Sequence, residues 1–529
     1  MKDPRPEARP QRARGEEDGV LLRGSAPVRA AAPVASRAVT APAESPPTLR
    51  PDAIGFGDAL VVGLAATSPA YSLAAVIGPI VALVGVHAPG VLLVSFVPML
   101  LIAAAFAALD RADPDCGTTF SWVTRAMGPW AGWIGGWAIA MTGVLVVGSL
   151  AEVGVRFTLL AVGLDGWESS TPVVLGLTVL LVLVMAALCV LGTELSARVQ
   201  NGLIVAQTVA LAVFAVVALV RGLRGDSPFG ALTPQWSWLD PSGAGGAALT
   251  GGLLLGVFAY WGWESAVNLT EETRGSAAGR AGVLSTVVLL LTYLGVAVAV
   301  VCFAGTSWLA ANADEEEAVF ALLSERVLGG WDWVVLLAVA TSAIASTQTT
   351  IIPASRTALS MARRAALPAR FGSISPRHRT PDVSTWWVAG IAVAWYLGVS
   401  ALSENALFDS ITALSLLIAL YYALTGIACA VYFRRRLTRS LRDLLLLGVG
   451  PLAGAGMLVW LLVLSVRDLA DPANSYTGAA WLGLGPPLVI GVVIMAAGVV
   501  LMLLWRRRDA RFWAERPQVS TDAVPPRAS

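Results

Sequence analysis

The sequence is poor in charged side chains and in the residue types that build most catalytic and metal sites. Only 13% of the 529 residues are charged, about half the share of an ordinary soluble protein. Two histidines occur, His87 and His378, and the four cysteines are scattered. This pattern offers neither a metal-ligand spacing nor a Cys/His nucleophile pair. We therefore expect no catalytic residue, no metal, no cofactor and no disulfide.

Three further absences narrow the function classes. Lysine occurs once, as Lys2. A phosphate-cradling Gly-rich loop and an ATP-binding motif are both missing, which argues against an enzyme and against an ATP-driven pump. The Ala-, Pro- and Arg-rich residues 1–50 contain no apolar stretch, so they predict a disordered tail and not a secretory signal. The net charge of +1 gives no reason to expect a nucleic-acid partner.

What the chain does contain is apolar sequence. Hydrophobic residues make up 56% of it, and the mean hydropathy is +0.71. Apolar runs of about 20 residues, the length of a membrane-spanning helix, recur from residue 57 onward. We predict an all-α polytopic membrane protein with about twelve transmembrane helices, placed at roughly 57–85, 88–109, 118–156, 171–192, 200–222, 246–270, 280–305, 331–357, 383–403, 406–433, 443–466 and 481–505.

Arginines gather in alternate connections between these spans. The poorer set holds only Arg156, Arg221, Arg224, Arg326 and Arg467. The richer set holds Arg111, Arg125, Arg198, Arg274, Arg280 and the runs 363–379, 434–442 and 506–511. The positive-inside rule assigns the richer set, both chain ends and the tail 509–529 to the cytoplasmic face of the cell membrane.

Two spans are interrupted at matching places. The first contains Pro69 within "ATSPAYS", and proline opens a helix because it lacks an N–H and clashes with the preceding turn. The sixth is interrupted around Tyr260 to Glu264. Paired interruptions are typical of transporters built from inverted repeats, here about 55–222 and 246–433 in a transporter domain 51–508, with two extra helices at 443–505. Unwound backbone presents free N–H and C=O groups, a combination that suits a zwitterion.

Four motifs together resemble those of a known family. They are "SPAYSL", "DPDCGTTFSWVTRAMGPWAGWIGGWA", "FAYWGWESAVNLTEETRGSAAGRAGVLST" and "STQTTIIPASRTALSMARRAALP". Over residues 55–470 the chain resembles the amino acid, polyamine and organocation permease superfamily, in particular amino acid permease-like proteins of actinobacteria. The resemblance implies a leucine-transporter-like fold with a five-plus-five inverted repeat, discontinuous helices one and six, and alternating access around a midplane site.

The resemblance also implies where a substrate binds. Its carboxylate would meet the amides that open the second half of helix one, and its amine would meet the carbonyls that close the first half of helix six. The implied substrate-binding residues are Thr67, Ser68, Ala70, Tyr71, Ser72, Phe258, Ala259, Tyr260, Trp261 and Gly262. One departure is Pro69, which stands where many relatives have a Gly-Ser-Gly type signature and has no N–H to offer.

Glu264 is the ionisable residue that most needs an explanation. A carboxylate in mid-membrane costs about 2.5–3.5 kcal/mol on insertion scales, whereas capping a half-helix returns about 0.3–1 kcal/mol. Three roles stay open: a helix cap, a carrier of a coupled proton, or a partner for the substrate's ammonium group. Asn268, Glu271 and Glu272 follow at helical spacing and predict one polar stripe. Helix five contains no lysine, which excludes the lysine-based proton mechanism of some relatives.

A sodium site is the alternative coupling site. Helix eight places Ala338, Thr341 and Ser342 on one face, a run that resembles the sodium-ligating stretch of leucine-transporter-type proteins, with carbonyls of Gly63 and Ala66 as further ligands. The competing interpretation is that these hydroxyl groups bond to their own helix or join helices. In helix ten, Tyr421, Tyr422 and Thr425 are candidates for a gate.

These observations favour a secondary active transporter that moves amino acids, coupled to H+ or Na+. Small residues and aromatic residues at the two breaks favour a neutral amino acid. A polyamine or organic cation permease is the alternative substrate class, and it needs a second acid facing the cavity. A non-transporting amino acid sensor of the same fold is the alternative function.

Overall fold

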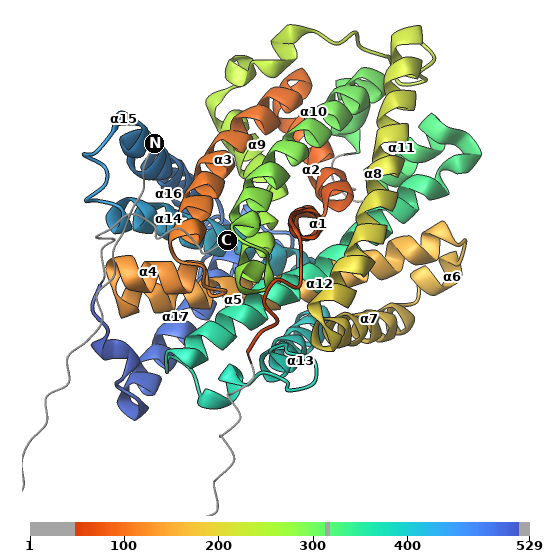
Figure 1. Ribbon diagram of the computed structural model, residues 1–529. Coiled ribbons are helices and arrows are strands. Elements are labelled where there is room, and N and C mark those ends of the chain that lie inside the picture. Colours follow the sequence, from red (N-terminus) through yellow and green to blue (C-terminus); the bar gives the residue numbers. More distant parts are fainter. Residues whose placement is uncertain (1–47, 313–317, 518–529) are drawn as a thin grey trace, which may run out of the picture. The chain divides into compact units, whose positions relative to one another are not determined.

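The computed structural model describes residues 48–312 and 318–517, so most of the predicted N-terminal tail and residues 518–529 of the predicted C-terminal tail lie outside the described ranges. The described residues are almost all helical, with two isolated β-bridges and no extended strand (Figure 1). The prediction of an all-α polytopic membrane protein is confirmed. All contacts given below lie within the unit that begins at Pro47.

Ten helical segments in the described ranges are long and apolar enough to cross a membrane. One of them, Phe56–Ala112, contains the first two predicted spans, and the sixth span is missing from the ten because its break leaves it too short. The principal helices are α1 (Phe56–Thr67), α2 (Pro69–Val84), α3 (Ala88–Ala112), α4 (Thr119–Met127), α5 (Pro129–Ala161), α7 (Thr171–Leu191), α8 (Thr193–Arg224), α9 (Gly246–Ala259), α10 (Ala277–Ala311), α12 (Trp333–Arg363), α13 (Asp382–Ser400), α14 (Glu404–Tyr432), α16 (Gly450–Asp468) and α17 (Pro486–Arg508).

Shorter segments connect these helices. Three are α-helical: α6 (Asp165–Glu168), α11 (Ala318–Leu328) and α15 (Leu441–Asp443). The most important for the site is η4 (Trp263–Glu272), a 3-10 helix that continues the sixth span after its break. A π-helical turn, η7 (Leu444–Val449), leads into α16.

The third predicted span, 118–156, is not one helix. It divides at Gly128 into α4 and α5 and runs on to Ala161. Gly128 has a φ of 101°, which favours glycine, and Pro129 has no N–H with which to continue the helix. The Gly-Pro pair therefore ends one helix and starts the next.

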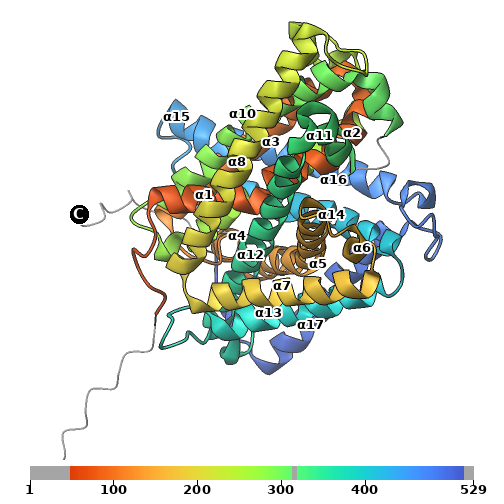
Figure 2. The same ribbon diagram turned by 90° about the vertical axis from the view of Figure 1, so that its right-hand side faces the viewer.

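The interrupted helices lie among the most buried ones. The helix α12 packs along α5 and also contacts α1, α8 and η4, while α10 contacts α1, α3 and η4. Figure 2 shows α7 and α13 lying along one another at the side of this group. The broken spans are therefore enclosed by other helices, as unwound backbone at membrane depth requires.

Candidate substrate and coupling site

The two helix breaks lie against each other, backbone to backbone. Gly262, between α9 and η4, has a φ of 116°, and a Cβ built on it would lie 2.5 Å from the carbonyl oxygen of Ala66 in α1. A Cβ on Gly63 would lie 3.2 Å from the carbonyl oxygen of Trp263. Only glycine permits this approach, so the interruptions predicted at residues 66–72 and 260–264 lie in direct contact.

The first break turns at Ser68, whose φ and ψ of 52° and 61° are left-handed. Pro69 is the first residue of α2, where its missing N–H costs nothing. The first helical hydrogen bond runs from the Ser72 amide to the Ser68 carbonyl at 2.8 Å. The amides of Ala70 and Tyr71 therefore precede the hydrogen-bonded turns, at the positive end of the α2 dipole.

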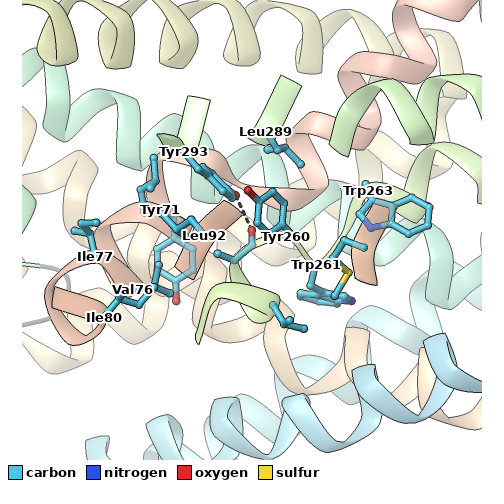
Figure 3. Close-up of a cluster of buried hydrophobic side chains, with 14 of the residues drawn as sticks. Tyr71, Val76, Ile77, Ile80, Leu92, Tyr260, Trp261, Trp263, Leu289 and Tyr293 are labelled. Carbon is cyan, nitrogen blue, oxygen red and sulfur yellow. Dashed lines mark hydrogen bonds between the residues drawn. The ribbon is translucent and has the colours of Figure 1, made fainter. Parts of the chain in front are cut away.

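The end of α9 presents three carbonyl groups, of which two have donors. The Phe258 carbonyl accepts from the Trp261 amide at 3.0 Å. The Ala259 carbonyl accepts from the hydroxyl group of Tyr293 on α10 at 2.6 Å, and Figure 3 shows the Tyr293 ring beside Tyr260. Within the described ranges we find no donor to the Tyr260 carbonyl. Tyr293 was not among the predicted site residues, since a lone tyrosine in an apolar span shows no pattern.

A cavity of about 820 Å³ reaches this region between α2, α9, α14 and α16. Tyr71 and Phe258 are the predicted substrate-binding residues that line it, with apolar neighbours such as Val76, Leu254 and Ile411. Its lining also includes Arg467, Asp468 and Asp471 around the end of α16. The remaining predicted substrate-binding residues are outside this lining, and Ala70, Ala259 and Tyr260 have no exposed surface.

Glu264 lies in a cage of aromatic hydroxyl groups. It is the second residue of η4, and 3% of its surface is exposed. The phenols of Tyr421 and Tyr422 on α14 each donate a hydrogen bond to its carboxylate. The Trp261 indole donates to the Tyr421 hydroxyl at 2.6 Å, and the Tyr422 ring stacks on Trp263. No arginine among the described residues pairs with Glu264, and its donors come from two of the three residues predicted as a gate.

The predicted polar stripe after Glu264 is wrong, because η4 is a 3-10 helix with about 3 residues per turn and spacings of four no longer share a face. Asn268 donates to the Cys116 carbonyl at 3.0 Å. Glu271 pairs with Arg363 at 2.8 Å. Glu272 pairs with the buried Arg356 of α12, a cation inside a span that the sequence interpretation overlooked.

The predicted sodium ligands already have hydrogen-bond partners. The Gly63 carbonyl accepts from the Thr67 hydroxyl, and the Ala66 carbonyl accepts from the Ser346 hydroxyl, each at 2.9 Å. The Thr341 hydroxyl bonds to the carbonyls of Leu337 and Ala338 in its own helix. Ser342 meets Ser68 across the helix pair, with 3.0 Å between their hydroxyl oxygens. The structure thus joins α1 to α12 here through Ser342 and the unpredicted Ser346.

The cytoplasmic tail predicted at 509–529 is in part folded. Phe512 is fully buried in a cluster with Phe120, Trp133 and Met361. Glu515 lies 3.5 Å from Arg364, which directly follows α12. The described part of this tail, up to residue 517, is therefore packed against α4, α5 and the end of α12.

Comparisons with known proteins agree with this architecture. Residues 53–504 match a protein-family model described as "Amino acid permease". An uncharacterized transporter of Mycobacterium tuberculosis is 28% identical over 349 residues, 64% of this chain and 72% of the relative. The branched-chain amino acid permease BcaP of Bacillus subtilis is 24% identical over 56% of this chain and 65% of its own length. The human Asc-type amino acid transporter 1 is 25% identical over 78% of this chain and 73% of its own. With a family match across most of its length, the chain belongs to the amino acid permease family.

Proposed function

We propose that the protein is a secondary active transporter that carries a neutral amino acid across the cell membrane by alternating access. The observation that carries the proposal is the meeting of the two helix breaks. It sets the amide end of α2 near the carbonyl end of α9, beside a cavity that reaches Tyr71 and Phe258. A carboxylate is favoured at the amide end and an ammonium group at the carbonyl end.

The division into repeats belongs to the same proposal. Residues 55–222 and 246–433 form two inverted repeats, and the two halves move against each other around the breaks. The interruption of the first helix in each half supports this division. The arginine-rich connections support a cytoplasmic position for both chain ends.

Proton coupling through Glu264 is the better supported of the two coupling schemes. A buried carboxylate that faces two phenols, and no cation from the described part of the chain, gains and loses a proton without breaking an ion pair. The alternative sodium ligands would each have to give up or share a protein hydrogen bond, as between Ser346 and Ala66. Binding of H+ at Glu264 would then change how η4 is held against α14.

A second substrate class is favoured by one observation. Asp468 and Asp471 line the cavity and supply the second acidic group that a polyamine or organic cation needs. Arg467 lines the same cavity and offsets part of this charge. Competition of labelled amino acid uptake by unlabelled polyamine separates the two classes.

The test is uptake of radiolabelled amino acids into proteoliposomes, with pH and sodium gradients imposed separately. We expect an inward proton gradient to stimulate uptake, and Glu264→Gln to abolish that stimulation. Glu152→Gln is the matched control, because Glu152 also lies in a span and accepts a hydrogen bond from a tyrosine, Tyr396 at 2.9 Å, but pairs with Arg156. Stimulation by sodium that survives Glu264→Gln would move the coupling to the Ser342 region. Binding without uptake under any gradient would favour the sensor.

A further inference from the structure

The connection between α14 and α16 carries a dense group of cations. Residues 433–443 read "FRRRLTRSLRD", and five of them are arginines. Arg436 lies 3.8 Å from Asp443 and stacks on the Phe433 ring. The other four, Arg434, Arg435, Arg439 and Arg442, are exposed and have no ion pair among the described residues. We call these four the arginine patch.

The backbone beneath the arginine patch is well anchored. Phe433 is 2% exposed, and Leu437 packs against Gly448 in η7, directly before α16. The Arg436 amide bonds to the Phe433 carbonyl at 2.7 Å, and the Ser440 hydroxyl caps the Asp443 amide at 3.0 Å. The four guanidinium groups thus project from a turn whose shape is held by buried side chains, so the backbone that carries them does not have to be ordered when a ligand binds.

Exposed leucines follow the arginine patch directly. Leu441 is 72% exposed, and Leu444, Leu445 and Leu446 are 39%, 49% and 50% exposed. These residues open the candidate membrane span Leu441–Asp468, and three of them belong to the π-helical turn η7. A solvated loop accounts for exposed arginines but not for exposed leucines next to them. The pairing of both indicates a surface that meets a charged headgroup and a hydrocarbon chain together.

We propose that the arginine patch and the leucines of η7 form a binding site for an anionic phospholipid. The guanidinium groups would donate hydrogen bonds to the lipid phosphate, for which their planar, bidentate geometry is suited. Attraction of each arginine to an anionic membrane surface adds to this. The acyl chains would lie along Leu445 and Leu446. The site is independent of the transported substrate and of the coupling ion.

The site has a route to the rest of the molecule. A Cβ on Gly426 of α14 would lie 2.7 Å from the Pro451 carbonyl of α16, so the two helices touch just beyond the arginine patch. The helix α14 also carries Tyr421 and Tyr422, the donors to Glu264. A lipid seated on the connection would hold the α14–α16 pair together, which should appear as a gain in thermal stability.

The experiment measures lipid binding to the purified full-length protein in neutral detergent. Phosphatidylglycerol and phosphatidylcholine are titrated separately, and retained lipid is counted by native mass spectrometry while unfolding is followed by intrinsic fluorescence. We expect phosphatidylglycerol to bind preferentially and to raise the unfolding temperature. Replacing all four arginines of the arginine patch by Gln should weaken phosphatidylglycerol binding roughly tenfold or more, and replacing them by Lys should retain part of it.

Controls separate this site from general charge and from free phosphate. Arg506, Arg507 and Arg508 also lie exposed at a helix end, and their replacement by Gln should leave most of the binding intact. Changing Leu445 and Leu446 to Ser should weaken lipid binding without changing charge. Equal loss in both arginine variants, equal binding of the two lipids, or the same stabilisation by inorganic phosphate alone would each overturn the proposal.

Discussion

The buried ion pair between Glu272 and Arg356 supports a prediction about folding stability. The magnitude of the expected loss follows from the geometry of the pair. The Nε and Nη2 atoms of Arg356 lie 2.8 and 2.5 Å from one carboxylate oxygen of Glu272, and the two side chains are 3% and 0% exposed. Arg356→Met would remove the buried counter-charge that Arg356 supplies to this carboxylate. Breaking such a pair from one side costs about 3–5 kcal/mol of folding free energy.

Two companion variants test the cause of that loss. Arg363→Met breaks the neighbouring pair with Glu271, whose side chains are 35% and 24% exposed, and such a partly solvated pair is worth about 0–1 kcal/mol. Arg356→Met combined with Glu272→Met removes both buried charges together. Replacement of a whole buried pair by apolar side chains is often close to neutral, so the double variant should be more stable than Arg356→Met alone.

Chemical unfolding in mixed micelles, followed by tryptophan fluorescence, ranks the four proteins. The expected order of stability places wild type and Arg363→Met close together, the double variant near them, and Arg356→Met well below. If Arg356→Met were as stable as Arg363→Met, the pair would not be desolvated as the structure has it. If the double variant were no more stable than Arg356→Met, the cost would come from packing and not from the loss of a buried counter-charge.

Three further predictions concern the site and its surroundings. Gly262→Ala should abolish uptake and lower expression, because the φ of 116° at Gly262 and the nearby α1 carbonyl leave no room for a Cβ. Gly57 has open space around it, so Gly57→Ala should behave as wild type in the same uptake assay. Tyr422→Phe removes one hydrogen-bond donor to Glu264, and a hydrogen bond to a charged group contributes about 1.5–3 kcal/mol. Because the ionised carboxylate loses a partner, the pH for half-maximal uptake should rise. An unchanged pH profile would contradict the role of Glu264 as the proton carrier. Burial raises the pKa of the Cys116 thiol well above its ordinary value. Iodoacetamide should therefore alkylate Cys116 far more slowly at pH 7.5 than it alkylates a solvent-exposed cysteine, and the rate should increase as the pH rises. Rapid labelling at pH 7.5, measured by peptide mass spectrometry, would show that the residue is not buried in solution.

Much of the architecture could be predicted because the bilayer imposes strong rules on sequence. Apolar runs of span length marked the helices, and Pro69 and the Trp-Gly-Trp-Glu stretch marked the two breaks. The break at Gly128 was missed, although the Gly-Pro pair signalled it, because small residues are also common on packing faces of membrane helices. A helix break can be predicted from the local sequence only where its residues favour a single interpretation.

The partners of the polar residues could not be predicted, and the reason is distance along the chain. Glu264 receives its hydrogen bonds from residues 157 and 158 positions away, and Arg356 reaches Glu272 across 84 positions. No periodicity encodes such pairs. The 3-10 form of η4 rotated Asn268 and Glu271 away from the stripe that α-helical spacing predicted.

The sequence alone therefore determined that this chain crosses a membrane as helices, where two of those helices open, and that one carboxylate lies at an opening. Each of these follows from the cost of exposing polar backbone or charge to hydrocarbon, a cost that acts on every short segment by itself. Only the tertiary structure decided what the opened backbone and the carboxylate touch: Ala66 against Gly262, Tyr293 on the Ala259 carbonyl, and two phenols on Glu264. Those contacts depend on how separate helices pack, and packing is a property of the whole chain.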